Sequence, residues 1–200
     1  ACIASGRRAI FLVPEIALTA QTLERIASRF PGKVALLHSG LTVGQRYDQW
    51  WRVKHGDFPI VLGSRGAIFA PVDNLGLIVI DEEHEWTYKQ GDQAPRYHAR
   101  VVAERLSKQT GAVLVLGSAT PDVSSYRSAR SGRYQLLELP QRLGSRLDTP
   151  SPKLSSPLAE TEIVDMRQER AEGHFDMLSR KLIDRMRDSL AGGGKVILFL

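Results

Sequence analysis

The sequence predicts an α/β protein in which a parallel sheet is flanked by helices. Between residues 9 and 139, short apolar segments rich in β-branched residues alternate with segments that have helical apolar spacing. Several of the apolar segments are followed at once by acidic, basic or small polar residues. Because ligands bind at the carboxyl ends of the strands in open α/β sheets, these polar clusters are the candidate sites.

The composition is that of a globular protein with a basic character. Hydrophobic residues make up 42% of the 200 residues, and charged residues make up 24%. The net charge of +5 permits a polyanionic partner without proving one. No apolar run approaches the roughly 20 residues that span a bilayer, so no membrane segment is expected, and there is no signal peptide. The single cysteine, Cys2, excludes an internal disulfide and a cysteine-built metal site, and it fits a reducing cytosol.

Three strands and two helices are expected in the first 62 residues. The strands are expected at 9–13, 34–37 and 58–62, and the helices at 19–30 and 43–55. Thr19 is the expected cap of the first helix, which Pro31-Gly32 stops. The second helix carries Tyr47, Trp50 and Trp51, a spacing that is more often typical of core residues than of a ligand platform.

Three further strands follow. They are expected at 76–80, 112–117 and 134–139, with helices at 97–108 and 122–130. Thr120 and Pro121 have the chemistry of a helix start, an N-cap followed by the first helical position.

The composition changes near residue 140. Residues 141–160 are rich in Pro, Ser, Gly and Arg, which predicts a linker. Strands at 162–166 and 195–200 and a helix at 178–190 then predict the start of a second α/β unit. We therefore expect a first domain at 1–140, the linker at 141–160 and the beginning of a second domain at 161–200. Because both termini have the pattern of interrupted elements, we expect a fragment cut at both ends.

Three carboxylates and a histidine, Asp81-Glu82-Glu83-His84, follow the strand at 76–80. Carboxylates at a strand end suit Mg²⁺, which is usually held by one or two of them together with substrate phosphates. Asp81 is the candidate metal ligand. The alternative is a solvated strand exit with no ligand, and the acidic cluster alone favours that interpretation.

Two further clusters have the chemistry of nucleic-acid binding. Gly63-Ser64-Arg65-Gly66 lets a phosphate approach the backbone while the arginine binds it, although most such tetrapeptides are simply turns. Residues 86–98 interleave aromatic rings with Lys and Arg, as in platforms on which single-stranded bases stack. The alternative for this loop is that its aromatic residues pack back onto the core.

Taken together, the clusters resemble the motor of superfamily 2 helicases, and specifically the replication-restart helicases of the primosomal protein N′ family. The matching segments are 13–19 (motif Ia), 37–41, 63–71 (motif Ib), 81–84 (the DEAH-type Walker B box, motif II), 88–100 (the aromatic-rich loop) and 117–121 (motif III). Val164-Asp165-Met166-Arg167 and the strand at 195–200 resemble the entry to the second motor domain. The resemblance covers nearly the whole chain.

The resemblance implies a RecA-like parallel sheet, ATP and Mg²⁺ as cofactors, and an incomplete P-loop NTPase motor. Asp81 would hold Mg²⁺ and Glu82 would orient and deprotonate the attacking water. Glu83 and His84, counted with them as the catalytic box, would couple the site to neighbouring motifs. Ser118, Ala119 and Thr120 would couple this box to neighbouring motifs, with the two hydroxyls as partners of Glu83 and His84. The residues implied in DNA binding are Pro14, Glu15, Gly63, Ser64, Arg65, Trp86, Tyr88, Lys89, Arg96 and Tyr97.

The chain also departs from the family pattern. No Gly-x-x-x-x-Gly-Lys-[Ser/Thr] loop occurs in it, and neither the second domain's arginine finger nor the zinc-binding cysteines expected in the intact family protein are present. The chain alone is therefore expected not to hydrolyse ATP.

The implied function is that of an ATP-driven 3′-to-5′ DNA helicase acting on single-stranded and forked DNA, with primosome and single-strand-binding proteins as partners. A cytoplasmic monomer is the favoured form, with the oligomeric state left open. Two alternatives remain: a DNA-binding or scaffold domain without catalysis, which the missing phosphate loop supports, and another superfamily 2 DNA translocase.

Overall fold

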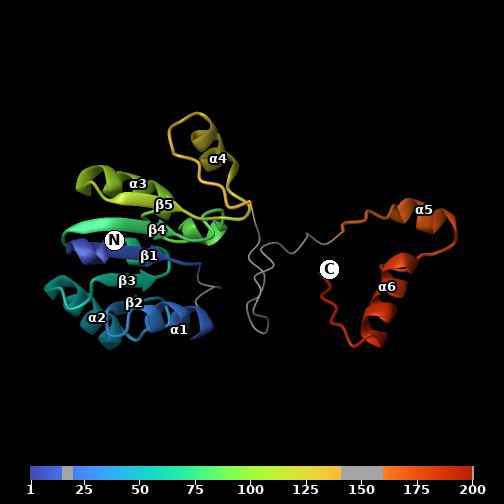
Figure 1. Ribbon diagram of the computed structural model, residues 1–200, viewed down its shortest axis with the longest axis horizontal. Helices are drawn as coiled ribbons and strands as arrows, with labels where there is room; N and C mark the ends of the chain where they lie inside the picture. The colour runs from blue at the N-terminus through green and yellow to red at the C-terminus, as the bar shows by residue number, and fades with distance from the viewer. Residues whose placement is uncertain (15–19, 141–159, 200) are drawn as a thin grey trace, which may run out of the picture. The chain divides into compact units, whose positions relative to one another are not determined.

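The computed structural model describes residues 1–14, 20–140 and 160–199. The chain divides into two compact units, Ala1–Leu137 and Glu138–Leu200. The first unit holds the sheet and the described candidate site residues, and the described part of the second holds two helices (Figure 1). No helix in the described ranges is long and apolar enough to cross a membrane.

The sheet has five strands, all parallel. They are β1 (Arg8–Leu12), β2 (Val34–Leu37), β3 (Ile60–Gly63), β4 (Leu75–Ile80) and β5 (Val113–Leu116), in the order β2-β3-β1-β4-β5. The chain therefore builds outward from β1 to one side, returns through β3, and then crosses to β4 on the other side. Because every pair is parallel, the carboxyl ends of all five strands share one edge. The α/β class and the parallel sheet are confirmed.

The helices and short 3-10 turns occupy the connections between strands. The α-helices are α1 (Ala20–Arg29), α2 (Val43–His55), α3 (Ala99–Thr110) and α4 (Val123–Arg130), and the 3-10 turns are η1 (Ile3–Ser5), η3 (Arg65–Phe69) and η4 (Trp86–Tyr88). Helix α2 begins at a capping box in which Thr42 accepts from the amide of Gln45 and the Gln45 side chain accepts from the amide of Thr42. Helix α2 packs on β2, and α3 packs on β4 and β5 (Figure 1).

The core lies along the three central strands. Ile10 and Leu12 of β1 and Ile78 and Ile80 of β4 are completely buried. Burying an aliphatic side chain of this size stabilises the fold by about 1.5–3 kcal/mol. Along the edge strand β5, by contrast, the side chains alternate between exposed and half-buried. The strong burial of β1 and β4 fixes the positions at which these two strands end, and this determines where Asp81 lies.

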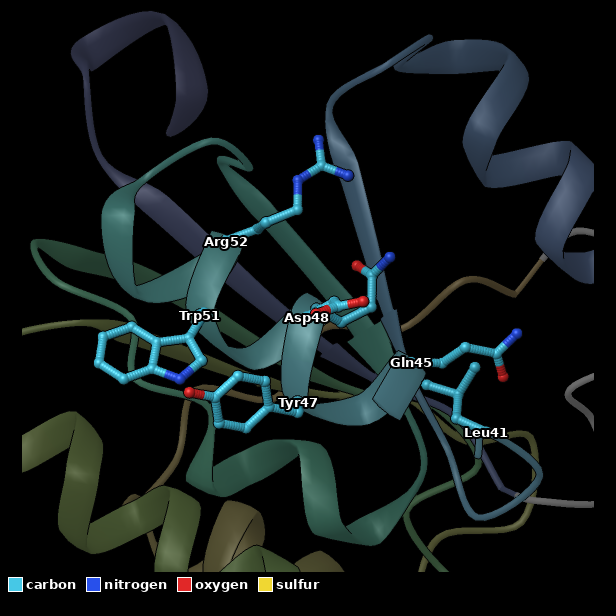
Figure 2. A pocket seen from close by; sticks show the side chains of 7 residues that line it. Leu41, Gln45, Tyr47, Asp48, Trp51 and Arg52 are labelled. Carbon is cyan, nitrogen blue, oxygen red and sulfur yellow. The ribbon is translucent and has the colours of Figure 1, made fainter. Parts of the chain in front are cut away.

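The aromatic residues of α2 correct a prediction. Tyr47 is 61% exposed and Trp50 is 37% exposed, and Val53 is the buried residue of this helix. The prediction that these aromatic residues belong to the core was therefore wrong, because only a narrow face of α2, centred on Val53, packs against the sheet. Tyr47 and Trp51 lie side by side on one flank of the helix, with ring centroids 6.0 Å apart, while Arg52 points away from them (Figure 2).

Several predicted elements do not form. No strand is present at 134–139, 162–166 or 195–199, and Leu200 lies outside the described residues. A strand requires hydrogen bonds to a neighbouring strand, and no partner strand is available to these segments in the described chain. The start of α4 is also different from the prediction: Asp122, not Thr120, caps this helix by accepting from the amide of Ser124. The predicted cap of α1, Thr19, lies outside the described residues.

The second unit contains two short helices, α5 (Met166–Ala171) and α6 (Arg180–Ala191). Ser179 caps α6 by accepting from the amide of Leu182. Arg180 forms ion pairs with Glu169 and Glu172, which joins the two helices. The predicted linker at 141–160 lies outside the described residues apart from its last residue.

Candidate functional site

Asp81 is the first residue after β4, and its backbone continues the sheet by one more hydrogen bond. Its amide donates to the carbonyl of Leu12 at 2.9 Å. Its exposed carboxylate accepts from the amide of Glu82 through Oδ1 at 3.1 Å. The hydrogen-bonded backbone of Asp81 therefore places its carboxylate in solvent at the carboxyl end of the sheet, where the sequence predicted it.

Glu82 has a backbone conformation that side-chain-bearing residues rarely adopt. Its φ is +45°. The neighbouring residues hold it there, since Glu83 donates to the carbonyl of Gly117 at 3.0 Å and Glu85 donates to the carbonyl of Glu82 at 2.9 Å. A left-handed conformation costs a non-glycine residue about 1–3 kcal/mol, and such strain concentrates at functional sites. The strain is thus located at the residue predicted to act on water.

His84 joins the end of β4 to the end of β5. Its Nδ1 lies 2.7 Å from the Ser118 hydroxyl, and its Nε2 lies 3.4 Å from the Thr120 hydroxyl. The same ring nitrogen Nδ1 is 3.6 Å from a carboxylate oxygen of Glu82. The expected contact between the acidic box and the two hydroxyls is therefore present for His84. Ala119 lies exposed between the two hydroxyl-bearing residues.

Glu83 faces the interior. It is 2% exposed and receives a hydrogen bond from Arg100 Nη1 at 2.9 Å, from the Asp122 amide at 2.8 Å and from the Ser125 hydroxyl at 2.6 Å. Glu83 was grouped with the catalytic residues, but these three donors occupy its carboxylate. Its predicted hydroxyl partners, Ser118 and Thr120, contact His84 instead. The geometry makes Glu83 a positioning residue that fixes the end of β4 against α3 and α4.

The electrostatics of this buried cluster favour its charged state. Burial tends to lower the pKa of Arg100, but hydrogen bonds to Asp122 and Glu83 outweigh it and raise that pKa. The hydrogen bond from the Ser124 hydroxyl, with further help from Arg100, lowers the pKa of Asp122 to about 2. Arg100, Asp122 and Ser125 were not predicted as site residues, because no local pattern in the sequence distinguishes them from other surface charges and hydroxyls.

The loop after the acidic box folds back onto the strand end. Tyr88 is 1% exposed, and its hydroxyl donates to the backbone carbonyl of Asp81 at 2.6 Å. Burial, followed by the nearby carboxylates of Asp81, Glu82 and Glu85, raises the pKa of Tyr88 well above its usual value. The prediction that Tyr88 stacks on DNA is wrong for this conformation, because its ring has no exposed face. Tyr88 instead supports the alternative in which the loop packs onto the core.

The rest of the loop is tied into a short hairpin and remains exposed. Lys89 and His98 form an antiparallel bridge, and the Lys89 ammonium donates to the carbonyl of Arg96 at 2.7 Å. Gln90 donates from its amide to the carbonyl of Tyr97 at 2.8 Å. Trp86 lies at the start of the loop and is almost fully exposed. The cations and the tryptophan are accessible to a ligand, as the sequence predicted.

Arg65 holds this loop from the side of β3. Its Nη1 donates to the carbonyls of Thr87 and Lys89, each at 2.8 Å. Ser64 is buried beneath it. A Cβ on Gly63 would lie 2.0 Å from the Leu37 carbonyl, so this glycine is required by the close approach of β2. The proposed phosphate contact of Gly63 and Ser64 is therefore not available, and Arg65 is the accessible residue of the three.

Of the predicted DNA-binding pair Pro14-Glu15, the structure describes only Pro14. Pro14 is fully buried at the end of β1, which leaves no surface for a phosphate. Glu15 lies outside the described residues.

The acidic box fits a Mg²⁺ ion held mainly by other ligands. The described residues contain no group of three or more His, Cys, Asp or Glu side chains that could hold a metal. Mg²⁺ keeps several waters and needs only one or two carboxylates beside substrate phosphates, so the exposed carboxylate of Asp81 is sufficient. The described residues hold no such group for zinc either, and Cys2 is the one cysteine of the chain.

Residues 2–129 match the family described as DEAD/DEAH box helicase. The chain belongs to this helicase family. The match covers all the strands and every candidate site residue. The RecA-like parallel sheet and the resemblance to helicases of superfamily 2 are thereby confirmed.

Individual relatives of this DEAD/DEAH box helicase chain carry a more specific name. The "Replication restart protein PriA" of Bacillus subtilis (strain 168) is 43% identical over 198 residues, which are 99% of this chain and 23% of that protein. The protein of the same name from Synechocystis sp. is 41% identical over 202 residues, again 99% of this chain and 23% of that protein. The chain thus spans less than a quarter of the length of these curated relatives.

Among solved structures, "Structure of RecG bound to three-way DNA junction" is 24% identical and covers 64% of this chain and 16% of that chain, with a TM-score of 0.42.

Proposed function

We propose that this chain is part of the motor of an ATP-dependent DNA helicase that acts in replication restart. One observation carries the proposal: the ends of β4 and β5 bring Asp81, a strained Glu82 and a hydrogen-bonded His84–Ser118 pair together at one edge of the sheet. The name of the relatives, replication restart protein PriA, supports the biological role.

The side chains of the acidic box have distinct tasks in this proposal. Asp81 holds Mg²⁺, which neutralises charge on the nucleotide phosphates when it is bound. Glu82 orients the attacking water and accepts its proton, as positioning and charge neutralisation are the main requirements of phosphoryl transfer. His84 lies 3.6 Å from the Glu82 carboxylate and also contacts the hydroxyls of Ser118 and Thr120. Through these contacts it links a change in the position or charge of Glu82 to the end of β5.

DNA binds along the exposed loop in this proposal. Arg65, Lys89 and Arg96 contact phosphates, and Trp86 and Tyr97 offer rings to bases. The loop is covalently continuous with the acidic box and is also bonded to it through Tyr88 and Asp81. Occupancy of the loop by single-stranded DNA therefore has a short physical path to Glu82, and this path couples DNA binding to ATP hydrolysis.

The complete activity belongs to the longer protein. The chain contains no phosphate-cradling Gly-x-x-x-x-Gly-Lys-[Ser/Thr] sequence, so we expect nucleotide hydrolysis only when the remaining parts are present. Movement in the 3′-to-5′ direction, a preference for forked DNA, primosome and single-strand-binding protein partners, a monomeric state and a cytoplasmic location are part of the same proposal. They are supported by the resemblance to replication-restart helicases.

The decisive experiment substitutes Glu82→Gln in the full-length protein. DNA-stimulated ATP hydrolysis should fall by at least about 100-fold, in keeping with the loss of a general base, while nucleotide binding is retained. Glu85→Gln is the matched control, because it removes the same charge three residues along the chain and should leave hydrolysis within about two-fold. Undiminished hydrolysis by Glu82→Gln contradicts the assignment. DNA binding without any hydrolysis by the unsubstituted protein would favour a non-catalytic DNA-binding module.

A further inference from the structure

A cavity of about 590 Å³ opens at the carboxyl ends of β2 and β3, across β1 from the acidic box. Four separate segments line it: the residues after β2, the middle of α2, the turn η3 and the tip of the loop at 90–97. Its size lies within the range of about 300–1,000 Å³ that holds small organic ligands. The acidic box does not line this cavity, whereas Arg65 and Tyr97 of the proposed DNA-binding surface do.

Three aromatic side chains form part of the cavity wall. Trp50 comes from α2, Phe69 from η3 and Tyr97 from the loop, and Phe69 and Tyr97 pack edge to face with centroids 4.8 Å apart. Trp50 and Phe69 are both substantially exposed, although large aromatic rings are favoured in the core. The exposed rings of Trp50 and Phe69, with the half-buried ring of Tyr97 beside them, provide stacking surfaces for a flat ligand.

The charge of the lining favours an anionic ligand. Among the described residues that line the cavity are Arg46 and Arg65, and none is Asp or Glu. Arg46 has a single long contact, 3.5 Å from Nη2 to the carbonyl of Ser39, so most of its guanidinium is available. The amide side chains of Gln90 and Gln93 also line the cavity, and such groups can pair with the edges of bases.

We propose that this cavity binds a nucleobase turned out of a single DNA strand, stacked against Trp50, with Arg46 and Arg65 on the flanking phosphates. The inference rests on the proposed function, since it requires that the chain bind single-stranded DNA. It adds a base-binding subsite and assigns the DNA contact to α2, a helix that lies outside every motif used to recognise the family. A protein partner could also pack on the aromatic wall, but the arginines, and the absence of carboxylates among the described lining residues, favour nucleic acid.

The test compares two DNA strands that differ only in their bases. Fluorescence anisotropy measures binding of the chain to a labelled oligothymidylate and to a strand of the same length in which the central nucleotides are abasic. Loss of one stacked base should weaken binding by about 5- to 150-fold. Trp50→Leu should weaken binding of oligothymidylate by a similar factor and leave the abasic strand unchanged, and Trp50→Phe should retain most of the discrimination.

Tyr47→Leu is the matched control, because Tyr47 is an exposed aromatic residue on the same helix that does not line the cavity. It should bind both strands as the unsubstituted chain does. Thermal unfolding of each variant confirms that the fold is intact.

The outcomes separate the two proposals. If the chain binds both strands equally, and its affinity falls as the salt concentration rises, the base subsite is overturned and DNA binding stands. Equal weakening of both strands by Trp50→Leu also overturns the subsite. If neither strand binds, the proposed function fails, and the subsite fails with it.

Discussion

The hydroxyl of Tyr88 donates a 2.6 Å hydrogen bond to the backbone carbonyl of Asp81. The two residues are seven apart in the chain, and between them the backbone passes through a strained Glu82 and a short 3-10 turn. The bond closes this segment into a ring, so the loop proposed to bind DNA cannot move far without moving the backbone carbonyl of Asp81, the proposed Mg²⁺ ligand. In the proposed function, the buried hydroxyl of Tyr88 is therefore the direct link between the DNA-binding loop and the acidic box.

Tyr88→Phe should lower the free energy of unfolding by about 1–2 kcal/mol, because the carbonyl of Asp81 loses its side-chain donor while the ring remains in the core. Urea unfolding measures this loss. Tyr134→Phe is a useful control, since the Tyr134 hydroxyl bonds to Glu104 at the surface of α3 and not to the acidic box. If Tyr134→Phe loses as much free energy of unfolding or more, the bond from Tyr88 to Asp81 contributes no more to stability than a bond at the surface.

The same tyrosine should make the fold sensitive to alkali. Burial raises the pKa of Tyr88 above its ordinary value of 10.0, so at higher pH the unfolded chain releases this proton while the folded chain keeps it. Stability from this group is complete below pH 10 and falls as the pH rises above that value. Tyr134, with its pKa raised to about 12, contributes in the same direction. Unfolding measured from pH 9 to pH 11 should therefore decline less steeply for Tyr88→Phe than for the unsubstituted chain.

Glu83→Gln should destabilise the fold by about 3–5 kcal/mol, the cost of breaking a buried ion pair by removing one partner. Glu83 is 2% exposed and receives three hydrogen bonds, so the amide that replaces it must present a donor to groups that also donate. A double-mutant cycle with Arg100→Met isolates the pair. A coupling energy below about 0.5 kcal/mol would contradict the positioning role that the geometry gives Glu83.

Glu82→Gly should raise the free energy of unfolding by about 0.5–1 kcal/mol while abolishing hydrolysis in the full-length protein. The substitution relieves the cost of a φ of +45°, and this gain exceeds the added entropy of the unfolded chain. Glu85→Gly is the matched control, because Glu85 has an ordinary φ of −62° and the same substitution there should destabilise. If both variants are destabilised alike, the strain at Glu82 is not stored in the native fold.

The sequence predicted the sheet and the acidic strand end but not how the loop is anchored. Continuous apolar runs identify β1 and β4, and the rule that parallel strands end at one edge brings Asp81 near Ser118 without further information. Burial of Tyr88 and the pairing of Glu83 with Arg100 depend on residues from three different elements, so no local pattern contains them. The strand predicted at 134–139 does not form for a different reason. Its apolar pattern suits a strand, but a local pattern does not show whether a partner strand is available.

Arg65→Lys tests whether the loop is held by the shape of the side chain or by its charge. A lysine keeps the charge but loses the planar guanidinium that bonds the carbonyls of Thr87 and Lys89 from one nitrogen. Loss of one such bond costs about 0.5–1.5 kcal/mol, so loop opening should become about 2- to 12-fold more frequent.

Hydrogen exchange at the Gln90 amide reports this opening, because that amide is bonded across the loop to the Tyr97 carbonyl. Arg46→Lys makes the same chemical change on α2, with no bond to the loop backbone in the described chain, and should leave the exchange rate unchanged. If the Gln90 rate is equally unaffected in Arg65→Lys, the two carbonyl contacts do not restrain the loop. In that case the loop is held by its other bonds, which include the one between Tyr88 and Asp81 and the one between Lys89 and Arg96.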